Sequence, residues 1–321
     1  MLSEYIKQKS LSNQTSMTEF LLLEFSDIRG NQILQFVVFL VFYLAAISGN
    51  LIIISAVILD RRLHTPMYFF LMNLAITDLG AVSVTIPKSM SNSLMNTRLI
   101  SYIGCIFQVS LFLLFAASDF TLLTVMAHDR YVAICNPLRY EIIMNKGACI
   151  QMAGSAWLSG FLYAILHNGT TFAMTFCSNV VDQFFCELPE LLKISCSNLY
   201  QVEYVLLILN ATITFGCFLF IVVTYMQILI TVSRMPSSKG RQKAFSTCIP
   251  HLIVVSMLLF TGMLVYLRPI PHVSSEINMV FAVIYSVIPP MMNPVIYSMR
   301  NKEIKLAVFK LFNLNNFQKL I

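Results

Sequence analysis

The sequence predicts an all-α membrane protein, a bundle of seven transmembrane helices, on two observations. The 321 residues are 57% hydrophobic and only 11% charged, whereas about a quarter of the residues in a soluble domain carry a charge. The chain also contains seven apolar runs, each long enough to cross a bilayer as a helix. These runs are about 33–58, 67–90, 105–128, 149–167, 203–231, 244–267 and 277–299.

The seven runs define one helical domain, 33–299, between two tails. The basic residues predict its orientation, because excess Lys and Arg stay in the cytoplasm. The segments 59–66, 129–148, 232–243 and 300–321 hold 14 of the 21 Lys and Arg. We therefore expect residues 1–32 to be extracellular and residues 300–321 to be cytoplasmic, with a short amphipathic helix in the latter.

The same orientation accounts for other features of the tails and the charge. The net charge of +6 reflects topology and gives no argument for a nucleic-acid partner. The first 30 residues lack a short apolar core followed by a small-residue cleavage site, so no cleaved signal peptide is expected. Asn13 begins a glycosylation acceptor, Asn-Gln-Thr. The sequence predicts a multi-pass protein of the plasma membrane, in contact with lipid.

Four of the eight cysteines are expected at the extracellular side. Cys105 opens the third helix, and Cys177, Cys186 and Cys196 lie in the outer loop, about 168–202. An oxidising exterior favours two disulfides, for which the sequence allows three connectivities. Zinc is the alternative, but spacings of nine and ten residues lack the short Cys-x-x-Cys pairs of zinc sites. A half-apolar loop held by disulfides should fold as a lid.

Polar residues interrupt four of the apolar runs. Asp78 and Asp119 lie in the second and third, and Asn50 and Asn293 in the first and seventh. Ionisable groups in a membrane are costly unless they are paired or hydrated. Any one of the four could simply make a helix–helix hydrogen bond, but together they favour a shared hydrated site. Two carboxylates close together would share a proton or bind a cation such as sodium.

The seventh run contains Pro289, Pro290 and Pro294. Each proline removes a backbone hydrogen bond and permits a kink. The sequence Asn293-Pro294-Val-Ile-Tyr297 places a polar group, a break and an aromatic hydroxyl near the cytoplasmic end. These residues indicate a helix that bends as part of a conformational switch.

Six motifs occur in a fixed order along the chain. They are Gly49-Asn50, LHTPMYFF at 63–70, NLAITD at 73–78, MAHDRYVAIC at 126–135, KAFSTC at 243–248 and PMMNPVIYSMRN at 290–301. Together they resemble the olfactory receptors, within the rhodopsin-like G-protein-coupled receptors. The resemblance covers roughly residues 20–312. It implies an odorant receptor that activates a stimulatory, olfactory-type G protein and raises cAMP.

The resemblance also implies roles for individual residues. Cys105 would pair with Cys186, and Cys177 with Cys196. Arg130 would hold the resting state through Asp129 and, on activation, swing toward the G protein. The sixth helix would begin at 243–248 and move outward, with His251 stabilising its inner end. The implied switch residues are Asp129, Arg130, Tyr131, Tyr225, Asn293, Pro294 and Tyr297.

Four residues depart from the family pattern. His128 stands where tyrosine is usual, and Pro250 where a small polar residue is usual. Asp119 replaces a common glutamate, and Leu259 replaces an aromatic residue often found at the floor of the pocket.

The ligand is expected in the outer half of the bundle, beneath the lid. Helical spacing from Cys105 brings several apolar side chains to one face of the third helix, and similar counting selects residues on three other helices. Each could instead face lipid or pack against a neighbour. The pocket would suit a small, mostly apolar volatile molecule, with Asn210, Tyr266 and Ser286 available for hydrogen bonds. The selected residues are Val109, Phe112, Leu113, Ala116, Leu206, Leu209, Asn210, Ile213, Gly262, Met263, Tyr266, Val283 and Ser286.

Several other classes of protein fit less well. Phe112 supplies no counter-ion for an amine where aminergic receptors have an aspartate, and residues 277–299 contain no lysine for retinal. No Ser-His-Asp set, phosphate loop or metal cluster indicates an enzyme, and a structural sodium ion at Asp78 and Asp119 is the one cofactor considered. A non-olfactory chemoreceptor remains an alternative. A transporter or channel would share the intramembrane carboxylates and broken helix, but no internal repeat is seen. A structural adhesion protein is a weaker alternative.

Overall fold

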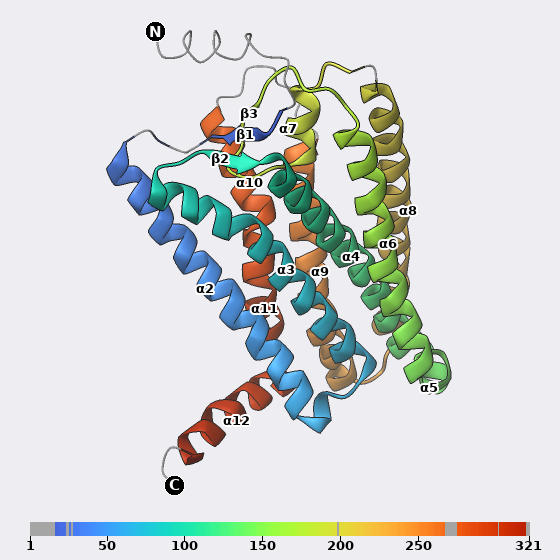
Figure 1. Cartoon of the computed structure of the whole chain (residues 1–321). Coiled ribbons are helices and arrows are strands. Elements are labelled where there is room, and N and C mark those ends of the chain that lie inside the picture. The colour runs from blue at the N-terminus through green and yellow to red at the C-terminus, as the bar shows by residue number, and fades with distance from the viewer. Residues whose placement is uncertain are drawn as a thin grey trace.

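A computed structural model describes residues 17–23, 26, 28–197, 199–266, 275–300 and 302–318. Over these residues, seven long apolar spans form a bundle (Figure 1), which confirms the predicted fold class. The helices are α2 (Arg29–Leu59), α3 (Pro66–Met95), α4 (Tyr102–Cys135), α6 (Lys146–Phe172), α8 (Tyr200–Ser233), α9 (Ser238–Tyr266), and the pair α10 (Ser275–Ser286) and α11 (Ile288–Arg300).

Most of the helices extend beyond the apolar runs that predicted them, because local capping decides where they end. Ser101 and Asn145 begin α4 and α6, and their side chains accept hydrogen bonds from Gly104 N (3.1 Å) and Ala148 N (2.9 Å). Asn96 ends α3 in the left-handed conformation, with φ of 52°. Hydropathy locates only the apolar part of a helix, so these polar ends were missed.

The seventh span is interrupted at Val287, just before Pro289 and Pro290, as the prolines led us to expect. Pro294 lies inside α11 and has no N–H with which to bond the carbonyl of Pro290, four residues earlier. Instead, Asn50 Nδ2 on α2 donates to Pro290 O at 2.9 Å. A side chain on the first helix therefore satisfies the acceptor that the proline leaves free.

Three short strands form a sheet at one end of the bundle, which we call the sheet end. They are β1 (Glu19–Leu22), β2 (Leu99–Ser101) and β3 (Val180–Val181), and β1 is central, antiparallel to β2 and parallel to β3. Phe20 and Leu22 are buried beneath it. This sheet adds to the all-α prediction, and the sequence missed it because such short strands carry little pattern and their partners are far apart in the chain.

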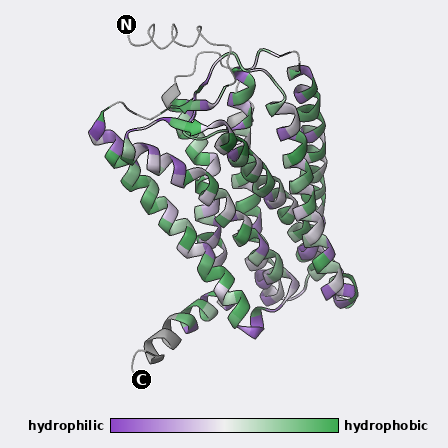
Figure 2. Cartoon of the chain, viewed as in Figure 1, coloured by the Kyte–Doolittle hydropathy of each residue, from purple (hydrophilic) through white to green (hydrophobic). Residues whose placement is uncertain are grey.

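The opposite end, which we call the Arg130 end, carries the short connections η1 (Arg61–Leu63), η2 (Pro137–Arg139) and α5 (Tyr140–Ile143). It also carries α12 (Lys302–Gln318), so β1 and α12 lie at opposite ends (Figure 1), as an odd number of spans requires. Hydrophobic residues predominate along the helices between the two ends (Figure 2).

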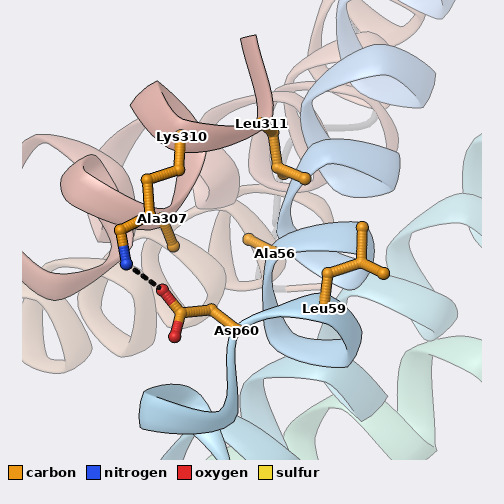
Figure 3. Close-up of a pocket in the computed structure, with 6 residues that line it drawn as sticks. All are labelled: Ala56, Leu59, Asp60, Ala307, Lys310 and Leu311. Atoms are coloured by element: carbon orange, nitrogen blue, oxygen red, sulfur yellow. Dashed lines mark hydrogen bonds and ion pairs between the residues drawn. The ribbon is translucent and has the colours of Figure 1, made fainter. Parts of the chain in front are cut away.

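α12 is the amphipathic helix expected in the C-terminal tail. Ile304 and Ala307 are buried, whereas Lys305 and Lys310 are exposed. A cavity of about 160 Å³ separates α12 from the end of α2 (Figure 3). Lys310 Nζ lies 3.1 Å from the carboxylate of Asp60. The backbone N–H of Arg62 and the Lys310 ammonium lower the pKa of Asp60, so this carboxylate is charged at neutral pH.

The helix α4 lies at the centre of the bundle and packs against α3, α6, α8 and α9. It comes close to α6 at Gly160. A Cβ added there would lie 2.5 Å from the carbonyl oxygen of Leu114 and would also overlap the Ser118 hydroxyl. Backbone atoms cannot move aside as a side chain can, so only glycine fits this crossing.

We expect Gly160→Ala to push α4 and α6 apart and lower the midpoint of thermal unfolding of the purified protein. The cost of such overpacking is typically about 1–3 kcal/mol. Gly154→Ala on the same helix is the matched control, because nothing lies within 4 Å of its added Cβ. Higher helix propensity should leave this control unchanged or more stable, by up to about 1 kcal/mol. Equal midpoints for the two variants would contradict the packing argument.

Candidate functional site

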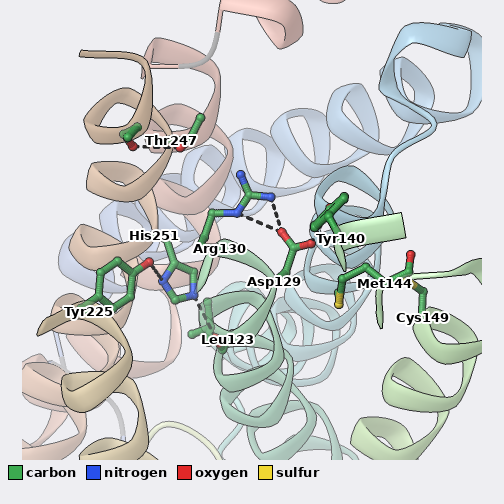
Figure 4. Close-up of polar contacts among 10 residues, drawn as sticks. Leu123, Asp129, Arg130, Tyr140, Met144, Cys149, Tyr225, Thr247 and His251 are labelled. Carbon is green, nitrogen blue, oxygen red and sulfur yellow. Dashed lines mark hydrogen bonds and ion pairs between the residues drawn. The ribbon is translucent and has the colours of Figure 1, made fainter. Parts of the chain in front are cut away.

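A buried charge pair stands at the Arg130 end of α4. The Asp129 carboxylate is fully buried and accepts hydrogen bonds from Arg130, whose Nε lies at 2.9 Å. Its other oxygen accepts from the Tyr140 hydroxyl at 2.8 Å (Figure 4). Burial of the phenol, together with the nearby Asp129 charge, raises the pKa of Tyr140. Tyr140 therefore stays protonated and remains a donor to Asp129.

The sequence did not identify Tyr140 as part of this cluster. It lies 11 positions after Asp129, in the short α5, where only the turn through η2 brings it back toward α4. A tyrosine shortly after the Asp-Arg-Tyr motif was the available signal, but its partner could not be chosen without the loop conformation.

A second polar chain joins three helices close to Arg130. His251 on α9 has its Nε2 2.9 Å from Leu123 O on α4, and its Nδ1 2.7 Å from the Tyr225 hydroxyl on α8 (Figure 4). A carbonyl oxygen can only accept, so Nε2 carries the proton. For the neutral imidazole, Nδ1 then accepts from Tyr225. His251 thus ties α4, α8 and α9 together.

Other predicted switch residues lie near this cluster without joining it. Tyr131 and His128 are half-buried on α4, with ring centroids 6.5 Å apart. The Tyr297 hydroxyl on α11 is buried and makes no hydrogen bond to the described residues. In this structure Arg130 therefore pairs with Asp129, and Tyr225 with His251.

Each of the four intramembrane polar residues makes a hydrogen bond to another helix. Both oxygens of Asp78 accept from Asn293 Nδ2, at 2.9 and 3.2 Å, and Asn50 reaches Pro290 O. Asp119 accepts from Thr77 Oγ1 at 2.5 Å. Thr77 was missed, because a threonine in an apolar run gives no signal of its own. Among the described residues, no group of three or more His, Cys, Asp or Glu side chains is arranged to hold a metal ion.

At the sheet end, two disulfides hold the lid. Cys105 on α4 is bonded to Cys186, with Cα atoms 5.5 Å apart, and Cys177 to Cys196 at 5.8 Å. The structure thus has the pairing that the family resemblance implied. Gln108, which the sequence did not single out, also holds the lid, because its Oε1 accepts from Cys186 N at 2.8 Å. The other four cysteines are free: Cys135, Cys149, Cys217 and Cys248.

The tip of the lid enters the bundle. Phe184 and Phe185 are buried, and the ring of Phe185 lies 5.3 Å from that of Phe112 on α4. Tyr285 on α10 donates a hydrogen bond to Glu187 of the lid. The aromatic rings and this hydrogen bond close the sheet end between α4 and α10.

The predicted ligand residues differ in their surroundings. Val109 and Leu113 pack in a core cluster with residues of β1 and β3. Asn210 donates to the Tyr163 hydroxyl at 3.4 Å. The side chain of Tyr266 and the acceptor Asn13 lie outside the described residues. The buried residues are Val109, Phe112, Leu113 and Ser286; those half-buried are Leu206, Asn210, Gly262 and Val283; those exposed are Ala116, Leu209, Ile213 and Met263.

The cavity of Figure 3 lies at the other end of the bundle, between α2 and α12, and contains none of these residues. It therefore belongs to the packing of the C-terminal helix and not to the predicted ligand site.

A seven-helix membrane bundle with a disulfide-bonded lid at one end, and a buried Asp-Arg pair at the other, is the architecture of a rhodopsin-like G-protein-coupled receptor. The chain belongs to the olfactory receptor family, whose model, "Olfactory receptor", matches residues 39–315. It is therefore a receptor of the plasma membrane and not an enzyme.

Individual relatives agree with this assignment over nearly the whole chain. Human olfactory receptor 14I1 is 48% identical over 303 residues, covering 94% of this chain and 97% of the relative. Human olfactory receptor 14A16 is 46% identical, covering 93% and 96%. Gorilla olfactory receptor 1G1 is 42% identical, also covering 93% and 96%.

We expect His251→Phe to lower the midpoint of thermal unfolding, because it removes the bond between α9 and the Leu123 carbonyl and leaves the buried Tyr225 hydroxyl without its partner. Each buried group left without a partner typically costs about 1–3 kcal/mol. Thr247→Val, one turn away on α9, is the control, since that hydroxyl bonds to Ala244 O of its own helix and, among the described residues, to no other helix. If both variants unfold at the temperature of the unmodified receptor, His251 does not join the three helices as described.

Proposed function

We propose that this olfactory receptor binds a small, mostly apolar volatile molecule in the sheet-end half of the bundle. Binding would activate a stimulatory, olfactory-type G protein and raise cAMP. The observation that carries the proposal is the pairing of an aromatic, lid-covered region at one end with a buried Asp-Arg pair at the other. Ligand binding at the sheet end would then change the contacts of Arg130 at the Arg130 end.

The character of the sheet end supports an apolar ligand. Phe112, Phe185 and Tyr285 contribute aromatic rings, and the surrounding cluster contains Val82, Ile86 and Ala282. Ligand pockets are typically apolar with a small number of polar groups. Asn210 and Ser286 supply two, and Tyr266 is proposed as a third.

The Arg130 end supports the switch. Arg130 is held by a single carboxylate, which is also bound by Tyr140. Tyr225 and Tyr297 are buried nearby and are the proposed partners of Arg130 after activation. The break at Val287 and the proline-containing α11 would let Asn293, Pro294 and Tyr297 move as one segment.

We further infer that the sheet end is extracellular and the Arg130 end is cytoplasmic. The excess of Lys and Arg in the segments at the Arg130 end supports this orientation. Residues 1–32 would then form an extracellular tail glycosylated at Asn13, residues 33–299 the bundle, and residues 300–321 the cytoplasmic tail.

Arg130→Ala should abolish most of the odorant response in cells that carry a cAMP reporter. Coupling between two sites typically amounts to about 5–150-fold, so the loss should be at least about fivefold at equal surface expression. The probe is a panel of volatile alcohols, aldehydes, ketones, esters and hydrocarbons. The control is Arg139→Ala, because Arg139 is an exposed residue of η2. This variant should respond to odorants as the unmodified receptor does. An undiminished response in Arg130→Ala would contradict the proposed role of Arg130 in the switch.

A sodium ion held by Asp78 and Asp119 is part of the proposal. Both carboxylates are buried, and the Asn293 Oδ1 atom beside Asp78 is buried with no hydrogen bond to the described residues. Hard cations such as sodium prefer oxygen ligands of this kind.

Sodium chloride should therefore raise the thermal unfolding midpoint of the purified receptor more than choline chloride at equal ionic strength. A ligand at 100 times its Kd stabilises by about 2.7 kcal/mol. The difference between the two salts should vanish in Asp119→Asn and in Asp78→Asn. A sodium effect of the same size in both variants would mean that these carboxylates do not bind the ion.

A further inference from the structure

A second buried ion pair lies at the sheet end, between α6 and α8. His167 Nδ1 contacts Glu203 Oε1, and the two side chains are 1% and 0% exposed. The hydroxyl of Thr170 donates to the other oxygen of Glu203. Both oxygens of the carboxylate are thus satisfied, by two residues of one neighbouring helix.

The two charges suit the ends of the helices that carry them. Glu203 lies in the first turn of α8, where the helix dipole favours a negative charge. His167 lies near the last turn of α6, which ends at Phe172, where the dipole favours a positive charge. The two helix ends that meet here are thus of opposite polarity.

This pair anchors a part of α8 that has no other buried side chain. Over residues 201–220, Glu203 alone is buried. The other half of α8, toward the Arg130 end, is packed conventionally, with Ile221, Tyr225, Ile228 and Val232 buried. Apolar side chains facing lipid do not fix the position of a helix, whereas a directional ion pair does.

A polar chain continues from this pair toward the proposed ligand region. The ring of Tyr163 lies 4.3 Å from that of His167, centroid to centroid, and the Tyr163 hydroxyl accepts from Asn210 Nδ2 at 3.4 Å. Asn210 is seven residues after Glu203, about two helical turns. The chain therefore lies along the face of α8 that also contains Leu206.

We propose that His167 and Glu203 are positioning residues for ligand selectivity: their ion pair holds the sheet-end half of α8 against α6 and so sets where Leu206 and Asn210 meet the ligand. The part concerning selectivity rests on the proposed function. Such a contact adds little net stability, but removing one partner leaves a buried polar group without its hydrogen bond. The role of the pair is therefore to define one position of the helix.

Amide hydrogen exchange on the purified receptor tests the positioning without any odorant. Glu203→Ala should speed exchange several-fold in residues 201–214 and leave residues 221–232 unchanged, because the latter keep their buried contacts. Thr170→Val, nearly equal in shape, removes one bond to the carboxylate and should give a smaller increase. Thr170→Val also provides the test of positioning if Glu203→Ala fails to fold. Thr212→Val is the control, because Thr212 is exposed and bonds only to Ile208 O.

The odorant panel tests the effect on selectivity. Glu203→Ala should change the ratio of EC50 values between two odorants by about tenfold, comparable to altering a pocket by one methylene. Glu203→Gln preserves shape and hydrogen bonding and should change the ratio less. A purely structural role would lower all responses together with surface expression and leave the ratio intact.

An unchanged exchange rate in 201–214, or an unchanged EC50 ratio, in both Glu203→Ala and Thr170→Val overturns the proposal. Failure of the proposed function would give a different result, because the unmodified receptor would then respond to no odorant in the panel. In that case the exchange measurement still decides whether the ion pair positions α8.

Discussion

Polar groups between the two ends of the bundle must find their partners within the protein, because hydrocarbon offers none. Most of the cross-helix hydrogen bonds follow from this constraint. Asn50 on α2 takes the carbonyl that Pro294 leaves free on α11, and Asn293 on α11 bonds the Asp78 carboxylate on α3. Trp157 on α6 donates to Asn73 on α3 at 3.1 Å. Since the apolar faces of the helices resemble lipid, these directional contacts determine which helices are neighbours and at what depth.

The same constraint explains how α8 is held. Two of its buried side chains, Glu203 and Tyr225, lie toward opposite ends and bond to His167 on α6 and His251 on α9. Between Glu203 and Ile221 its side chains are exposed or only half-buried. The sheet-end half of α8 is therefore packed less tightly than the half toward the Arg130 end. This arrangement gives α8 a physical route by which a ligand near Asn210 could influence the Arg130 end.

The lid gives the sheet end its rigidity by different means. Outside the hydrocarbon, backbone pairing is available, and β1 inserts between β2 and β3. Two disulfides and the Gln108 contact add fixed points. The lid therefore covers the bundle as a folded unit, with Phe184 and Phe185 directed inward, and it limits the region that a ligand can occupy.

Composition and the ordered motifs were sufficient to predict the seven spans, the break near Pro289 and the family, because these depend on the residues of each segment alone. The Asp129–Arg130 pair was predictable for the same reason, since its members are adjacent. Its third member, Tyr140, depends on the turn through η2. The pairing of Thr77 with Asp119, the strand β1 and the His167–Glu203 ion pair likewise join segments distant in the chain. Only the packing of the helices decides which polar groups meet, because an apolar run can turn any of its faces toward a neighbour until its few polar side chains find partners.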